Sequence, residues 1–150
     1  MSTDVLIQFK DLGLALILSL SAIGSALGTG IAGMAAVGVW KKAFSQNKPA
    51  SFMLVAFVGA PLTQTIYGMI IMNKMAEMVI KGSYFWSIGF CGFAIGSSAL
   101  MQGKAAAVAC NAMGETGKGF GNYIIVLGII ETVALFVMAF ALGLIEKLAG

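Results

Sequence analysis

Four stretches of apolar residues, separated by short polar segments, dominate the pattern along the chain. The apolar stretches cover residues 12–39, 51–73, 84–109 and 123–145. The polar connections cover residues 41–50, 74–83 and 111–122. Each apolar stretch is long enough for a membrane-spanning helix, which needs about 20 apolar residues. The pattern therefore predicts an all-α membrane protein with four transmembrane helices.

The composition supports this fold class. Of the 150 residues, 59% are hydrophobic and 10% are charged, whereas soluble domains carry about 25% charged residues. The nine basic residues are all lysines and are scattered, so we expect no nucleic-acid surface. Because the lysines balance across the predicted membrane, the positive-inside rule gives no orientation. The chain has no histidine, and its one deeply placed carboxylate has no obvious nucleophilic partner, so we expect a non-catalytic protein.

The four predicted helices form two similar pairs. Residues 22–25 and residues 94–97 have the same sequence, Ala-Ile-Gly-Ser, in the first and third helices. Gln64 in the second helix and Glu131 in the fourth are each followed by a threonine. Both matches agree on the same pairing, so we infer a tandem duplication of a two-helix hairpin.

The duplication divides one membrane domain into a first hairpin, residues 1–80, and a second hairpin, residues 81–150. The first and third helices are rich in glycine and serine, which let helix backbones approach closely in lipid. The second and fourth helices are richer in bulky apolar residues that suit contact with lipid. Two arrangements fit this pattern. One is a compact four-helix bundle, and the other is a ring of many copies with the small-residue helices innermost.

Glu131 is the residue that points most directly to a function. It is one carboxylate within residues 123–145, an otherwise uncharged apolar run. A charge at that depth costs at least about 2.5–3.5 kcal/mol. The cost falls if the carboxylate holds a proton, pairs with a cation or coordinates a metal ion. We therefore expect Glu131 to bind and move a monovalent cation.

The second predicted helix adds uncharged oxygen atoms at a similar depth. Pro61 cannot donate to the carbonyl four residues earlier, which loosens the backbone there. Thr63 and Tyr67 are four residues apart and share a helix face, with Gln64 beside them. Gln102 adds another carboxamide in the third helix. Oxygen ligands with a single negative charge suit a hard monovalent cation.

Each of these residues also has an ordinary structural interpretation. Thr63 could bond back to its own helix, Tyr67 could be a packing aromatic, and Pro61 could be only a kink. Gln64 or Gln102 could join helices by hydrogen bonds. Their occurrence together with one buried carboxylate favours an ion site.

These residues carry a resemblance to a known family. The motifs are a glycine-rich first span, Pro-x-Thr-Gln-x-x-Tyr-Gly at residues 61–68, Gln-Gly-Lys at 102–104 and Glu-Thr at 131–132. Over nearly its whole length the chain resembles the duplicated, four-helix proteolipid of V-type rotary ATPases, the rotor ring component known as the K or c subunit. It is especially similar to the sodium-pumping bacterial members. The resemblance implies a homo-oligomeric rotor ring in a bacterial cell membrane.

The resemblance also implies a role for each residue of the site. Glu131 would bind Na⁺, with H⁺ as the alternative coupling ion and no organic cofactor. Side-chain oxygens would come from Thr63, Gln64 and Gln102, and a backbone carbonyl from Ala60. Tyr67 would donate a hydrogen bond to Glu131 and help to close the site. Gln64 would stand where a second carboxylate has been lost.

The family further implies partners for this chain. A stator subunit would supply half-channels and an arginine, a residue that this chain lacks. Proteins of the central stalk would contact the connections at 41–50 and 111–122, and lipid would surround the ring. ATP would be split elsewhere, so the chain itself would not be an enzyme.

Two other classes of protein stay open at this point. A small proton-coupled multidrug exporter would also have four spans and one buried glutamate, although aromatic residues for stacking a flat substrate are sparse. A structural tetraspan protein or a ring-forming channel would not need Glu131. Replacement of that glutamate by glutamine distinguishes these classes from a rotor subunit.

Overall fold

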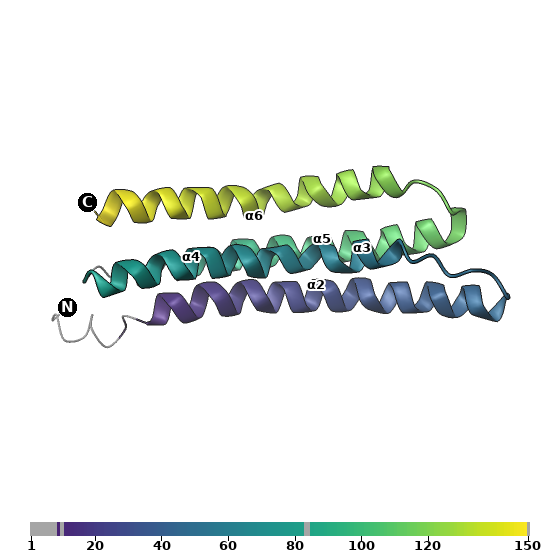
Figure 1. Ribbon diagram of the computed structural model, residues 1–150, viewed down its shortest axis with the longest axis horizontal. Coiled ribbons are helices and arrows are strands. Elements are labelled where there is room, and N and C mark those ends of the chain that lie inside the picture. The colour runs from purple at the N-terminus through teal and green to yellow at the C-terminus, as the bar shows by residue number, and fades with distance from the viewer. Residues whose placement is uncertain (1–8, 10, 83–84, 150) are drawn as a thin grey trace.

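The computed structural model describes residues 9, 11–82 and 85–149 (Figure 1). The long helices are α2 (Leu12–Ser45), α4 (Thr63–Ile80), α5 (Cys91–Thr116) and α6 (Phe120–Ala149). Short helices precede α4 and α5: α3 (Leu54–Gly59), the 3-10 helix η1 (Ala60–Leu62) and the 3-10 helix η2 (Trp86–Phe90). The prediction of an all-α fold with four helical segments is confirmed, although residue 84, where the third span was expected to begin, lies outside the described residues.

The four long segments run side by side and alternate in direction along the chain (Figure 1). Helices α2 and α5 run parallel to each other and make the most extensive contact in the bundle. Helix α3, η1 and α4 continue one another as a single segment, Leu54–Ile80, that runs the opposite way. The division into duplicated hairpins at residues 1–80 and 81–150 stays a prediction.

The helices extend further than the apolar pattern predicted. The expected connection at 41–50 begins inside α2, which continues to Ser45, and α4 continues to Ile80. The expected connection at 111–122 is mostly helical, because α5 continues to Thr116 and α6 begins at Phe120. The boundaries were wrong because lysine, alanine and glutamate at these ends are good helix formers although they are not uniformly apolar.

Three segments have the length and hydropathy of a membrane span: Leu12–Ser45, Leu54–Ile80 and Phe120–Leu148. Helix α5 falls short of that hydropathy within the described part of the chain. The reason is its content of glycine, serine, Gln102 and Lys104. Helix α5 lies between α2 and α6 and packs against both, so its less apolar surface is largely covered by protein.

Glycines allow α2 and α5 to approach each other closely. A Cβ atom on Gly24 would lie 2.1 Å from the carbonyl oxygen of Gly96, and one on Gly103 would lie 2.2 Å from the backbone of Gly28. No side chain fits at such distances, so this helix pair depends on glycine. Gly24 and Gly96 are the matching positions of the two Ala-Ile-Gly-Ser segments, and they face each other.

Two apolar clusters fill the bundle, one toward each end. The first includes Ile17, Ile71 and Ile145, and the second includes Ala36, Phe57 and Met113. Buried polar side chains occupy the level between them: Ser21, Ser25, Gln64, Ser98 and Gln102. This polar layer is where the predicted site residues lie.

Candidate cation-binding site

Glu131 lies on α6 and accepts hydrogen bonds from two other helices. The Oη of Tyr67 on α4 donates to Glu131 Oε1 at 2.5 Å. The Nε2 of Gln102 on α5 donates to Glu131 Oε2 at 3.3 Å. Both carboxylate oxygens therefore have a donor, and these bonds tie α6 to α4 and α5 at the level of Glu131.

The two glutamines continue this network into the centre of the bundle. Gln64 Nε2 donates to Gln102 Oε1 at 2.7 Å, and Gln102 Nε2 also donates to the Leu127 carbonyl at 3.0 Å. Both glutamine side chains are fully buried. Because a buried amide without partners costs free energy, these bonds fix the spacing of α4, α5 and α6.

Thr63 and Ala60 complete the set at the break in the helix. Thr63 Oγ1 lies 3.0 Å from the Ala60 carbonyl oxygen and 3.1 Å from Gln64 Oε1. Its single proton serves one acceptor at a time. Pro61 interrupts the helix as predicted, and the chain forms the 3-10 turn η1 there. The six residues predicted for the site thus lie next to one another, and the Thr63 hydroxyl donates either to Ala60 or to Gln64.

Two further hydrogen bonds lie at or beside this network and were not predicted. The Leu127 carbonyl accepts from Gln102, and Ser98 Oγ donates to the Ile130 carbonyl at 2.9 Å. Both bonds join α5 to α6 next to Glu131. Ser98 is four residues before Gln102 and shares its helix face, so its spacing was a usable signal. A backbone carbonyl such as that of Leu127 leaves no signal in the sequence.

Access to the site differs from residue to residue. Gln64 and Gln102 are closed off, whereas Glu131, Thr63 and Tyr67 are partly exposed on the outer side of the bundle. Much of the outward surface of α6 is apolar, with Ile129 64% and Phe136 63% exposed. The carboxylate therefore opens toward the surface that suits lipid or a neighbouring protein, and not toward the bundle centre.

The chemistry available here is that of oxygen ligands around one charge. Among the residues that the structure describes, no group of three His, Cys, Asp or Glu side chains is placed to hold a metal ion. A cation at Glu131 would be held by one carboxylate and by neutral amide, hydroxyl and carbonyl oxygens. Such a donor set fits a monovalent ion such as Na⁺, or a proton on the carboxylate itself.

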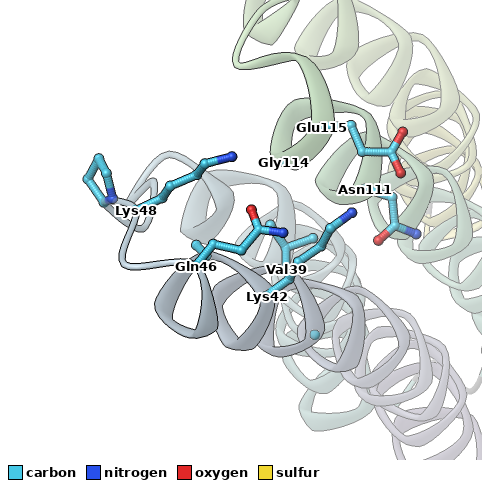
Figure 2. A pocket seen from close by; sticks show the side chains of 10 residues that line it. Val39, Lys42, Gln46, Lys48, Asn111, Gly114 and Glu115 are labelled. Carbon is cyan, nitrogen blue, oxygen red and sulfur yellow. The ribbon is translucent and has the colours of Figure 1, made fainter.

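A polar cleft of about 440 Å³ lies elsewhere, at the end of the bundle where α2 and α5 terminate. Figure 2 shows Lys42, Gln46 and Lys48 on one side of it and Asn111 and Glu115 on the other. Helices α2 and α5 touch where Val39 and Gly114 line the cleft, since a Cβ on Gly114 would lie 2.3 Å from the Val39 side chain. The cleft joins the two ends that were expected to meet another protein, and it is separate from the polar layer around Glu131.

Comparison with known proteins gives two findings. Residues 86–144 match the family model of the ATP synthase C subunit. The chain is also 29% identical over 136 residues to the A-type ATP synthase subunit K of Methanocaldococcus jannaschii. The aligned region covers 89% of this chain. The chain spans 60% of the length of that relative. Together with the three candidate spans, these matches describe an integral, multi-pass membrane protein.

Proposed function

We propose that the chain is the ion-carrying rotor ring subunit of the membrane sector of a V-type ATPase in a bacterial cell membrane. The observation that carries the proposal is the position of Glu131. It is a lone carboxylate in an apolar helix, joined by hydrogen bonds to side chains of two other helices. Further support comes from the similarity of residues 86–144 to a family of ATP synthase subunits.

The proposed cargo is Na⁺, held by Glu131, Gln102, Gln64, Thr63 and the Ala60 carbonyl. Gln102 turns its amide nitrogen toward Glu131 in this structure. To present oxygen to a cation, its carboxamide has to rotate about its last bond by half a turn, and Gln64 has to respond because it donates to Gln102. Na⁺ binding would therefore reorganise the glutamine pair. Tyr67 would keep its bond to the carboxylate and close the site.

Neutralisation of Glu131 is the physical basis of transport in this proposal. A carboxylate that carries Na⁺ or H⁺ can pass through lipid as a neutral group, whereas a bare carboxylate is strongly disfavoured there. The partial exposure of Glu131 on the outer side of the bundle lets a stator subunit reach it. The stator would supply half-channels and an arginine that displaces the ion. The chain splits no ATP in this scheme.

The polar cleft between α2 and α5 fits the proposed contact with the central stalk. It includes lysines, carboxamides and a carboxylate, which can pair with polar groups of another protein. Most residues that line the cleft lie inside the connections at 41–50 and 111–122 that were expected to contact the stalk, at the ends of α2 and α5 and in the turn after α2. Other copies of the chain and lipid would cover the sides of the bundle.

Transport of H⁺ is the second candidate for the same rotor. The observation in its favour is that the nearest groups to the carboxylate are donors: the Tyr67 hydroxyl and the Gln102 amide nitrogen. This arrangement serves a carboxylate that exchanges a proton without any change in the glutamine pair. A small multidrug exporter is a more distant alternative, and drug resistance conferred by the isolated protein would favour it.

Modification of Glu131 by a carbodiimide distinguishes the two ions. The protonated carboxyl group transfers its proton to a carbodiimide nitrogen and its oxygen then adds to the carbodiimide carbon, so bound Na⁺, which displaces the proton, should slow the reaction at fixed pH. We expect protection that rises with Na⁺ and not with equal K⁺. A labelling rate that does not change with Na⁺ would reject the sodium proposal and favour a rotor that carries H⁺. Imaging of the purified complex tests the rotor itself: a closed ring of this chain supports it, and a monomer or an open dimer rejects it.

A further inference from the structure

The hydroxyl groups of Ser25 and Thr29 on α2 differ from other helical hydroxyls of the chain in their hydrogen bonding. The side-chain oxygens of Ser25 and Thr29 are buried and form no hydrogen bond with any part of the chain that the structure describes. Serine and threonine in helices commonly bond back to a carbonyl of the preceding turn. Ser19, Ser21 and Thr132 do so here, at 2.6–2.7 Å. Ser25 and Thr29 are therefore held away from the usual acceptor.

The packing of α2 on α4 places these two hydroxyls at the level of the ion site. A Cβ on Gly68 would lie 2.6 Å from Ser21 Oγ, and one on Gly28 would lie 3.0 Å from Pro61 Cβ. The two helices are antiparallel, so the register between these contacts is constant. Ser25, four residues after Ser21, is level with Gln64, and Thr29 is level with Ala60.

The opposing surface at this level contains a carbonyl that has lost its donor. Pro61 has no N–H group and cannot bond to the carbonyl of Phe57, four residues earlier. Glycine at position 28 lets α2 touch the proline ring directly. In membranes, hydroxyl side chains and ordered water re-satisfy backbone groups that a proline frees. Three polar groups, two from α2 and one from the α3–η1 junction, thus lie at the level where α2 packs against Pro61.

We propose that Ser25 and Thr29 bind a buried water molecule that hydrogen-bonds to the carbonyl freed by Pro61. Three partners are the usual number for a buried water. The water fixes η1, which carries the Ala60 carbonyl, and it lies behind Gln64. Ser25 and Thr29 are in this sense positioning residues for the ion site. That second part rests on the proposed function, whereas the water site itself does not.

The sign of a stability change tests the water site. The variants Ser25→Ala and Thr29→Val are made in the full chain, and the melting temperature of the purified assembly is measured. If the hydroxyls hold water against a buried carbonyl, each variant leaves polar groups unpaired and lowers the Tm by roughly 2–4 °C. If they are unpaired groups in dry packing, their removal raises the Tm, which overturns the proposal. Ser21→Ala is the matched control, because its hydroxyl bonds only to its own helix.

A double-mutant cycle with Pro61 identifies the third partner. Pro61→Ala restores an N–H group for the Phe57 carbonyl, so Thr29→Val should lower the Tm by less than half as much in that background. An equal loss in both backgrounds would mean that Thr29 has another partner, and the proposal would be wrong. Should Pro61→Ala fail to assemble, a high-resolution map of the unsubstituted ring decides. Density within hydrogen-bond distance of both hydroxyls supports the water site, and its absence rejects it.

The ion site supplies a separate readout. If Thr29→Val removes the water, the Ala60 carbonyl is displaced. The Na⁺ concentration needed for half-protection of Glu131 should then rise by roughly 10-fold, as it does when an outer-shell partner is lost in metal sites. Ser21→Ala should leave it unchanged. An unchanged value in Thr29→Val would reject the positioning role. If Na⁺ fails to protect even the unsubstituted protein, the sodium function is rejected, while the Tm and the cycle still decide on the water.

Discussion

Gln64 and Glu131, the two positions that the predicted duplication pairs, have different surroundings in the structure. Gln64 is fully buried, and its amide nitrogen donates a hydrogen bond to Gln102. Glu131 is partly exposed on the outer side and accepts hydrogen bonds from Gln102 and Tyr67. The carboxamide of Gln64 thus occupies the buried position, and the carboxyl group of Glu131 occupies the partly exposed one.

The backbones of the hairpins differ in the same way. The segment that carries Gln64 is broken by the 3-10 turn η1, whereas α6 is continuous past Glu131. The first hairpin supplies the Ala60 carbonyl at the 3-10 turn, and the second supplies the carboxylate of Glu131. Neither hairpin has both features, so the proposed site needs residues from both hairpins. If the hairpins arose by duplication, they have since taken separate roles.

The largest effect is expected from making the two positions alike. Glu131→Gln removes the charge but keeps an oxygen that can accept from Tyr67. We expect ion transport and carbodiimide labelling to fall at least about 100-fold while the ring still assembles. Glu146→Gln is the control, since that carboxylate lies near the end of α6 with 67% of its side chain exposed, and it should be almost neutral. Transport that survives Glu131→Gln would favour a structural tetraspan protein.

The opposite exchange tests whether the sealed position tolerates a charge. Gln64→Glu puts a second carboxylate in a fully buried place. We expect the free energy of unfolding to fall by about 3–5 kcal/mol at neutral pH and to recover partly as the pH is lowered, because the protonated form is neutral. Gln46→Glu makes the same change at an exposed site and should have little effect. A stable Gln64→Glu ring would show that burial did not exclude the charge.

Removal of the Tyr67 hydroxyl should lower the affinity of Glu131 for its ion without abolishing binding. Tyr67→Phe deletes the bond to Glu131 Oε1, and bonds to charged groups contribute about 1.5–3 kcal/mol. We expect ion affinity to fall by roughly 10- to 100-fold, read from Na⁺ protection or from the pH dependence of labelling. Tyr123→Phe makes the same change near the start of α6 and should leave the affinity intact. Equal losses in both variants would point to general damage.

The smallest effect is expected from the contact that holds the hairpins together. Gly103→Ala brings a Cβ to 2.2 Å from the Gly28 backbone and should destabilise the bundle by about 1–3 kcal/mol. Gly128→Ala, on α6, has open space around its Cβ and should be neutral or stabilising by up to about 1 kcal/mol. Thermal unfolding in detergent measures both. If the two variants behave alike, close approach of α2 and α5 is not required.

The sequence singled out most residues of the candidate site because polar residues are costly in an apolar span. Glu131, Gln64, Gln102 and Thr63 stood out for this reason, and the structure connects them. The motif resemblance added Ala60, whose backbone carbonyl has no side-chain signal of its own. The sequence could not predict that the Leu127 carbonyl joins the network, because any residue type supplies a carbonyl.

Other features depended on three-dimensional packing. The ends of α2 and α5 continue past the apolar spans, since helix propensity and not hydropathy sets those boundaries. The direction of the Gln102 amide follows from its neighbours, because both of its ends are polar. Ser25 and Thr29 looked like ordinary small residues of a glycine-rich helix. Only the structure shows that their two hydroxyls are buried without a bond to their own helix.

The account rests on one ion site for every four helices, at Glu131 and not at Gln64. Equilibrium binding of radioactive Na⁺ to the purified ring, with the chain quantified in the same sample, tests this claim most directly. The predicted result is one saturable Na⁺ for each chain, lost in Glu131→Gln and retained in Glu146→Gln. Two ions for each chain, or a single ion that persists in Glu131→Gln, would contradict the account.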